Sequence, residues 1–137
     1  MQNRDLAEDY VRRAALRLKA IDVLYSAAGW ADVVRESQEV VELALKGLLR
    51  ACGIEPPRIH DVSEILIAEK DRLPEGVRTE LEGLTRISKE LRRDRELAFY
   101  GAEDLTPSSF YSQTDADQAR DGARWTVQVV TPVVLQG

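Results

Sequence analysis

The sequence has few of the residues that most catalytic and metal sites require. Its 137 residues include one cysteine, Cys52, and one histidine, His60. A single cysteine cannot form an internal disulfide, and nothing in the composition requires an oxidising compartment. A single histidine excludes two-histidine mechanisms and the common cysteine–histidine zinc sites within one chain. We therefore expect no metal, and we expect His60 to be a helix-start or packing residue.

Glycine-rich phosphate loops are also missing. Neither a GxGxxG nor a GxxxxGK[ST] pattern occurs, so the common phosphate-binding loops are excluded. Asp115 and Asp117 stand close together but lack the glycine and terminal glutamate of a calcium loop. We expect them to stabilise the positive end of the last helix, and we expect no cofactor.

Long apolar runs are absent as well. No uncharged segment approaches the roughly 18–20 residues of a membrane span, and the first residues do not form the apolar core of a signal peptide. With 19 Lys and Arg against 24 Asp and Glu, the net charge is −5. This charge argues against a protein that coats DNA, because neutralising phosphates requires a cationic surface. We expect a cytoplasmic protein with no membrane segment and one domain over residues 1–137.

Apolar residues recur every three or four positions along the first two thirds of the chain, which is the spacing of one helix face. We predict a first helix over about residues 4–28 and a second over 30–52, which ends before two prolines. A third begins where Asp61 caps the helix N-terminus. A fourth has Pro74 in its first turn and ends before Gly101.

The last third combines a predicted loop with a final helix. Residues 101–113 show no helical period, and a loop of that length is often functional. We expect this loop to border the functional cleft and Phe110 to pack on the bundle, with capping of a bound base as the alternative. The final helix is expected to begin near Thr114 and to be ended or kinked by Pro132. Together these elements predict an all-α, up-and-down bundle of about five helices.

A basic segment lies near the end of the predicted fourth helix. The segment from residue 86 to residue 95 contains five lysine or arginine residues and two aspartate or glutamate residues, which gives a local charge of +3. At about 100° per residue, Arg86, Lys89 and Arg93 fall within roughly 60° of Tyr100 on one helix face. The face is either a solvated helix surface or a strip that binds an anion. The candidate ligand-binding residues are Arg86, Lys89, Arg92, Arg93, Arg95 and Tyr100.

Arg95 points in a different direction from the rest of this strip. Its position on the helix lies close to those of Leu84 and Leu91, on the apolar stripe. An unpaired buried guanidinium is costly, so we expect Arg95 to meet a carboxylate, a partner subunit or a ligand anion.

Four segments form a further pattern through their order and spacing. They are residues 37–46, His60-Asp61-Val62, residues 92–101, and Phe110-Tyr111 with Thr114 and Ala116. Each is weak alone, because a pair such as Glu42 and Lys46 occurs in ordinary helices. Together they resemble the HEPN domain (higher eukaryotes and prokaryotes nucleotide-binding) over nearly the whole chain. The resemblance implies a HEPN-like bundle of about five helices.

Ribonuclease members of that family carry an arginine followed by a histidine at the end of this helix, and a dimer brings two such motifs together. Here Arg95 or Arg93 is followed by Tyr100 instead. A phenol with a pKa near 10 is a poor base at neutral pH. Arginine can still hold phosphate, and tyrosine can stack on a base. The resemblance therefore implies a non-catalytic homodimer that binds a nucleotide or RNA, or that accompanies a separately encoded minimal nucleotidyltransferase, as the family often does.

Two other functions stay open. One is a metal-independent ribonuclease, the toxin of a toxin–antitoxin pair, in which Arg95 and Tyr100 are the candidate catalytic residues. The other is a structural partner protein without a ligand. Cleavage of RNA and binding of nucleotides distinguish these alternatives from the non-catalytic module.

Overall fold

The computed structural model describes residues 2–56, 58, 61–100 and 106–135, with the side chains of 2–3 and 94–100 left undescribed. The elements are α1 (Gln2–Ser26), α2 (Trp30–Ala51), α3 (Val62–Ala68), the 3-10 turn η1 (Lys70–Arg72), α4 (Glu75–Arg78), α5 (Leu81–Tyr100), α6 (Pro107–Phe110) and α7 (Gln113–Leu135). No strand occurs among these residues, and the all-α prediction is confirmed. The five predicted helices correspond to α1, α2, α3, α5 and α7, while α4 and α6 are single turns.

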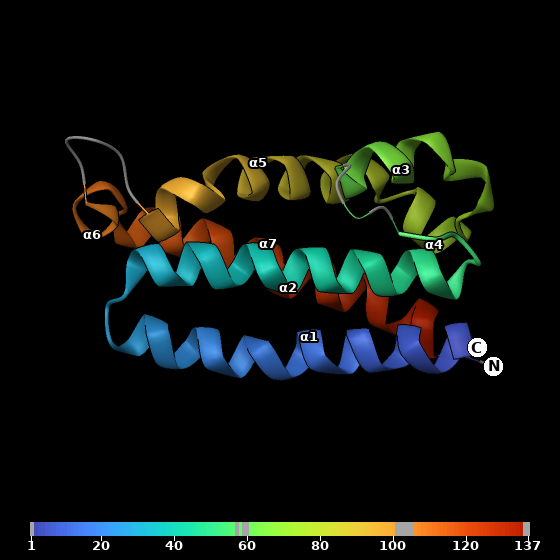
Figure 1. The fold of residues 1–137 in the computed structure, drawn as a ribbon, viewed down its shortest axis with the longest axis horizontal. Helices are drawn as coiled ribbons and strands as arrows, with labels where there is room; N and C mark the ends of the chain where they lie inside the picture. Colours follow the sequence, from blue (N-terminus) through green and yellow to red (C-terminus); the bar gives the residue numbers. More distant parts are fainter. Residues whose placement is uncertain (1, 57, 59–60, 101–105, 136–137) are drawn as a thin grey trace.

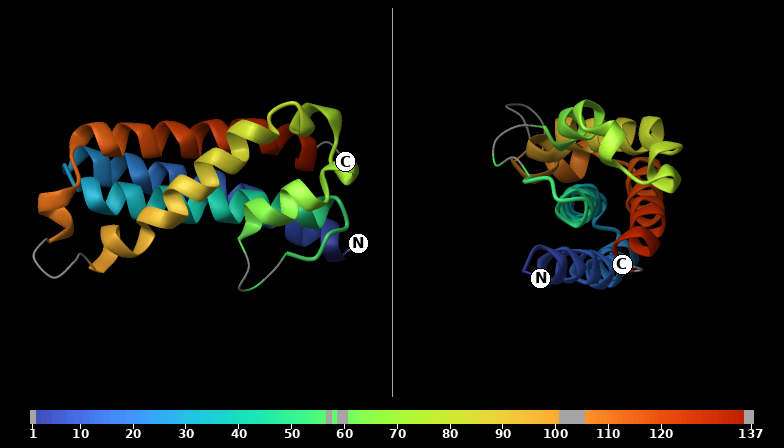
Figure 2. Two further views of the ribbon diagram at one scale, coloured as in Figure 1. Left: turned by 90° about the horizontal axis from the view of Figure 1, so that it is seen from above. Right: turned by 90° about the vertical axis from the view of Figure 1, so that its right-hand side faces the viewer.

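Helix α2 lies at the centre of the bundle. It contacts α1, α5 and α7, and the views show α5 crossing α2 at an angle while α1 and α7 run alongside (Figure 1 and Figure 2). Its buried apolar residues are Ala31, Val33, Val34, Val40, Val41, Ala44, Leu45, Leu48 and Leu49. A helix that is apolar on several sides belongs in the interior of a bundle. None of the described helices has the length and apolar character needed to cross a membrane.

The turn between α1 and α2 depends on a residue in the left-handed region. Ala28 has φ 60°, and the backbone N–H of Gly29 donates to the carbonyl of Leu24 at 2.9 Å. This is the hydrogen bond that closes a Schellman motif at a helix C-terminus. The first helix therefore ends at Ser26, two residues before the predicted end, and α2 begins at Trp30 as predicted.

Helices α1 and α2 approach each other closely at Gly47. A Cβ atom at this position would lie 3.0 Å from Cγ2 of Val11 and 3.1 Å from the carbonyl oxygen of Ala7. Both contacts are shorter than the roughly 3.5–4.0 Å of ordinary carbon contacts. The absence of a side chain at Gly47 therefore sets how near the two helices can come.

The predicted fourth helix is correct only in its second part. The cap at Asp61 is confirmed, because its Oδ1 accepts a hydrogen bond from the backbone N–H of Ser63 at 2.9 Å. Pro74 precedes α4 in an extended conformation, with ψ 153°, and α4 ends at Arg78 after one turn. The long helix α5 begins only at Leu81. Pro74 thus precedes a separate turn that buries Val77, and it is not the start of α5.

The predicted loop 101–113 contains a helical turn. Thr106 caps α6 by accepting from the backbone N–H of Ser109 at 3.3 Å, and Pro107 occupies its first turn. Proline is favoured there because the N–H it lacks would have no partner in the helix. Helix α7 contains Pro132 and continues to Leu135, so this proline does not end the helix.

Candidate nucleic-acid interface

The exposed face of α5 carries a row of cations. Arg86, Lys89 and Arg92 are exposed, and within the part of the chain that the structure describes none of their side chains forms a hydrogen bond or ion pair. Arg93 is also exposed, and it does have an interaction partner. An unpaired surface cation can neutralise a phosphate without giving up another partner. This row is therefore available to an anionic ligand.

The arginines of α1 are engaged differently. Arg4 and Arg12 both pair with Glu8, each at 3.5 Å. Arg17 pairs with Glu36 at 2.6 Å. The charge of these cations is neutralised within the bundle, whereas that of the α5 row is not.

A cavity of about 180 Å³ lies beside the middle of α5, where α5 faces α2 and α7. Its apolar lining consists of Val34, Ile87, Leu91, Tyr111 and Ala119, and its polar lining of Glu90, Arg93, Asp115 and Gln118. Polar groups contribute more of the exposed lining than apolar groups do, and two of the four polar residues are carboxylates. Arg93 connects this cavity to the row of cations.

The first half of α5 faces a different environment. A groove of about 730 Å³ runs between α5 and α7, and Arg86 lines it together with Glu80, Glu90 and Asp121. These carboxylates repel a phosphate bound next to Arg86. Of the predicted strip, Lys89 and Arg92 line neither the groove nor the cavity and are therefore better placed for an anion than Arg86, while Arg93 shares its cavity with Glu90 and Asp115.

Two of the predicted site residues lie in α5 at positions whose side chains are not described. The backbone is helical through Arg95 and Tyr100, but the side chains of both fall outside the described residues. His60 falls outside them entirely. The expected roles of these three residues stay predictions.

The comparisons with known proteins agree with the architecture. A family model described as the HEPN domain matches residues 7–131, which is most of the chain. The chain belongs to the HEPN domain family. The resemblance inferred from the sequence motifs is thus confirmed, and it supports a module of the nucleotide-binding or ribonuclease type. No curated protein and no solved structure gives a significant match.

In this HEPN domain it is Tyr111, and not Phe110, that packs on the bundle. Tyr111 is 5% exposed and lines the 180 Å³ cavity, whereas Phe110 is 45% exposed. The two rings meet edge to face with centroids 4.9 Å apart. The prediction for Phe110 is wrong: α6 ends at Phe110, and the residue after it, the C-cap Tyr111, is the aromatic residue buried against the bundle.

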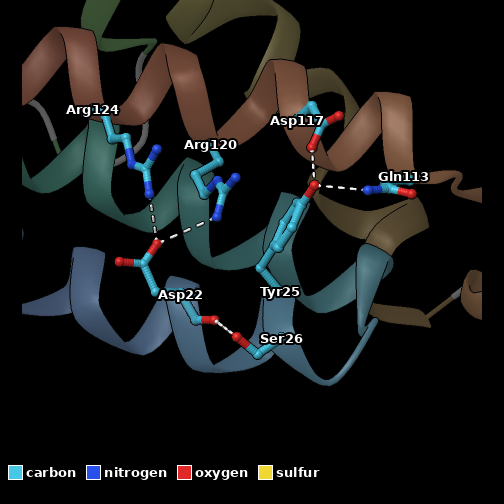
Figure 3. Close-up of polar contacts among 7 residues, drawn as sticks. All are labelled: Asp22, Tyr25, Ser26, Gln113, Asp117, Arg120 and Arg124. Carbon is cyan, nitrogen blue, oxygen red and sulfur yellow. Dashed lines mark hydrogen bonds and ion pairs between the residues drawn. The ribbon is translucent and has the colours of Figure 1, made fainter.

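A polar network that the sequence analysis missed joins α1 to α7 in the HEPN domain (Figure 3). The hydroxyl of Tyr25 donates to Oδ1 of Asp117 at 2.5 Å and accepts from Nε2 of Gln113 at 2.9 Å. The guanidinium of Arg120 lies over the Tyr25 ring, 3.6 Å from its centroid, a cation–π arrangement. Asp117 therefore holds two helices together, in addition to its predicted place in the first turns of the last helix.

The same face of α7 also binds α1 through an ion-pair cluster. Oδ1 of Asp22 lies 2.8 Å from Arg124 and 3.5 Å from Arg120 (Figure 3). About a hundred residues separate these partners along the chain, so no local spacing could indicate the pairs. The network stabilises the α1–α7 contact at the end of the bundle where α7 begins.

Cys52 lies just after α2, whose C-terminus is at the opposite end of the bundle from that of α5 (Figure 1). Burial raises the pKa of its thiol above the ordinary value, while Arg72 and Arg4 oppose this shift. A thiol with a raised pKa is protonated at neutral pH and is a weak nucleophile. In the described ranges, no group of three or more histidine, cysteine, aspartate or glutamate side chains is arranged to hold a metal.

Proposed function

We propose that this HEPN domain binds a nucleotide or RNA at the second half of α5 and does not cleave it. The observation that carries the proposal is the part of the row formed by Lys89 and Arg92, whose side chains are exposed and unpaired among the described residues. In a protein with a net charge of −5, such a row is a local site of positive potential. Positive potential attracts phosphates from a distance and is weakened by salt.

The cavity beside the row suits the base of such a ligand. Phosphate contacts would come from Lys89, Arg92 and Arg93, because arginine offers a planar pair of donors to phosphate oxygens. The apolar wall and the Tyr111 ring would hold a planar base, as aromatic side chains do in single-strand binding sites. In this proposal Arg95 and Tyr100 add further contacts from the end of α5.

Binding without cleavage follows from the residue that stands where ribonuclease members carry histidine. That residue is Tyr100, and a phenol is almost fully protonated at neutral pH unless its surroundings change its pKa strongly. Metal-independent cleavage of RNA needs a group that can accept the proton of the attacking hydroxyl. This requirement makes a toxin ribonuclease the less favoured function.

The proposal includes a homodimer and a partner enzyme. The sequence places Arg95 and Phe99 next to the apolar stripe of α5, and a second copy would cover such a mixed surface in a self-complementary interface. The proposed partner is a minimal nucleotidyltransferase encoded separately. Sedimentation at micromolar concentration should give a dimer, and a monomer alone, or a dimer built only on α1, would contradict this part.

Titration with labelled RNA and with labelled nucleotide at low salt tests the binding site. Lys89→Ala, Arg92→Ala and Arg93→Ala should each weaken binding by about 1–3 kcal/mol, the scale of a hydrogen bond to a charged group. Arg78→Ala is the matched control, because Arg78 is exposed and unpaired within the described residues but lies on α4. No binding at low salt, or an equal loss in Arg78→Ala, would reject the site.

Incubation of the protein with labelled RNA tests whether the module is catalytic. The proposal predicts intact RNA and binding that survives in Tyr100→Phe, since phenylalanine keeps the stacking surface. Arg95→Lys should bind more weakly than the unmodified protein because an ammonium lacks the planar fork of arginine. A cleavage product that disappears in Arg95→Ala would instead establish the ribonuclease function.

A further inference from the structure

The groove between α5 and α7 has an aromatic and apolar floor. Gly83, Ile87, Gly122 and Trp125 line it, and Trp125 is half-buried. A Cβ atom at Gly83 would lie only 2.7 Å from Cη2 of Trp125. Because Gly83 has no side chain, the indole ring can lie against α5, where it is part of the groove wall.

The rim of the groove is acidic. Glu80, Glu90 and Asp121 are exposed, and none of their side chains forms an ion pair or hydrogen bond with any residue that the structure describes. Arg86 is the single cation among the lining residues, so the lining charge is −2. Unpaired carboxylates around an indole ring attract cations through both charge and the ring face.

The spacing of the carboxylates indicates how large the cation must be. Glu80 directly precedes α5 and its carbonyl accepts from the backbone N–H of Leu84. Glu90 lies ten residues further along, which is about 15 Å along the axis at a rise of 1.5 Å per residue. One metal ion or one ammonium group cannot contact both. The ligand must carry several positive charges over this length, as an extended peptide of about five residues does.

We propose that the α5–α7 groove binds a short basic segment of a partner polypeptide. Its arginine or lysine side chains pair with Glu80, Glu90 and Asp121, and one of them stacks on Trp125. The charge of the groove is opposite to that of the Lys89 and Arg92 surface, so α5 presents two sites of opposite preference. The groove shares Ile87, Glu90 and Gln118 with the 180 Å³ cavity, whereas Asp121 and Trp125 line the groove alone and distinguish this site from the proposed nucleotide site.

The fluorescence of Trp125 offers a direct test. The chain has two tryptophans, and Trp30→Phe leaves Trp125 as the single reporter while keeping an aromatic ring beside Tyr25. Hexa-arginine peptide is the probe, titrated at low salt, with hexa-glutamate as the control of opposite charge. We expect a saturating change in Trp125 emission with hexa-arginine and no change with hexa-glutamate.

Substitutions within the Trp30→Phe protein locate the binding. Glu90→Gln and Asp121→Asn should each raise the dissociation constant of hexa-arginine about two- to fivefold, as expected for exposed charge pairs. Glu82→Gln is the matched control, because Glu82 is an exposed carboxylate of α5 that does not line the groove. Arg86→Ala should strengthen binding more than Lys89→Ala does, since only Arg86 lies in the groove.

Three results would overturn the proposal. They are a Trp125 emission that hexa-arginine leaves unchanged, a loss of affinity in Glu82→Gln equal to that in Glu90→Gln, and an equal emission change with AMP or hexa-glutamate. The substituted side chains are exposed, and circular dichroism checks that each variant keeps its helices. Nucleotide affinity measured on the Asp121→Asn sample reports separately on the α5 cations, because Asp121 lines the groove and not the 180 Å³ cavity, so either site can fail alone.

Discussion

Replacing Gly47 by alanine should destabilise the bundle even though alanine is the better helix former. In a helix interior, alanine is favoured over glycine by about 0.5–1 kcal/mol. At Gly47 the new Cβ would lie 3.0 Å from Val11 Cγ2, 3.1 Å from the Ala7 carbonyl oxygen and 3.2 Å from Tyr10 Cβ. Ordinary contacts need about half an ångström more, so α1 and α2 must separate.

The size of the effect follows from these two opposing contributions. Adding a methyl group to a tightly packed contact costs about 1–3 kcal/mol. After subtracting the gain in helix propensity, we expect Gly47→Ala to lower the free energy of unfolding by about 0.5–2 kcal/mol. Urea unfolding followed by circular dichroism measures this change directly.

Gly76→Ala is the matched control for this measurement. Gly76 lies in α4, and a Cβ atom there would have no atom within 4 Å. This variant should show only the benefit of alanine, a stability equal to or up to about 1 kcal/mol above the unmodified protein. If Gly47→Ala matched Gly76→Ala, the α1–α2 contact would not be as close as inferred, and the reasoning would fail.

Three further predictions concern the core, the polar network and the cysteine. Leu84 is fully buried on α5, so Leu84→Ala should lower the free energy of unfolding in urea by about 2–5 kcal/mol. Leu16 is 63% exposed, so the control Leu16→Ala should change this free energy by less than about 0.5 kcal/mol. Tyr25→Phe leaves Asp117 without its hydroxyl donor and should cost about 1–3 kcal/mol in the same assay; an unchanged midpoint would mean that water replaces the hydroxyl. Burial raises the pKa of Cys52, so iodoacetamide should react with it more slowly than with free cysteine at neutral pH, and a faster reaction would refute the burial argument. Because this pKa is raised in the folded state, its contribution to stability is complete below the ordinary thiol pKa and is lost as pH rises through the folded value.

At the candidate site, the spacing of residues along the sequence predicts some features of the α5 cations and not others. The helical period places Arg86, Lys89 and Arg93 on neighbouring directions of one helix, because each residue turns the helix by about 100°. The helical period carries no information about which residues of other helices lie opposite α5. Asp121 comes from α7, and its position beside Arg86 depends on how α5 crosses the bundle (Figure 2). The opposite charges along α5 could therefore be recognised only in three dimensions.

At the start of α5, too, the sequence predicts only part of the structure. The sequence correctly indicates that a helix begins beside Pro74, although Pro74 is the N-cap of α4 and not part of its first turn. It does not show that this helix ends after one turn at Arg78. The turn buries Val77 against the rest of the bundle, and such a contact with distant residues outweighs the weak preference for one continuous helix.

The sequence by itself determined the all-α class, the main helices, the Asp61 cap and the break before Trp30. Each of these depends on residues within about four positions of one another, so periodicity and capping preferences are sufficient. Only the tertiary structure decided that Tyr111 is buried, that Tyr25 bonds Asp117 across 92 residues, and that carboxylates surround Arg86. Those contacts depend on the rotation and crossing of packed helices, which arise from the mutual fit of side chains far apart in the chain.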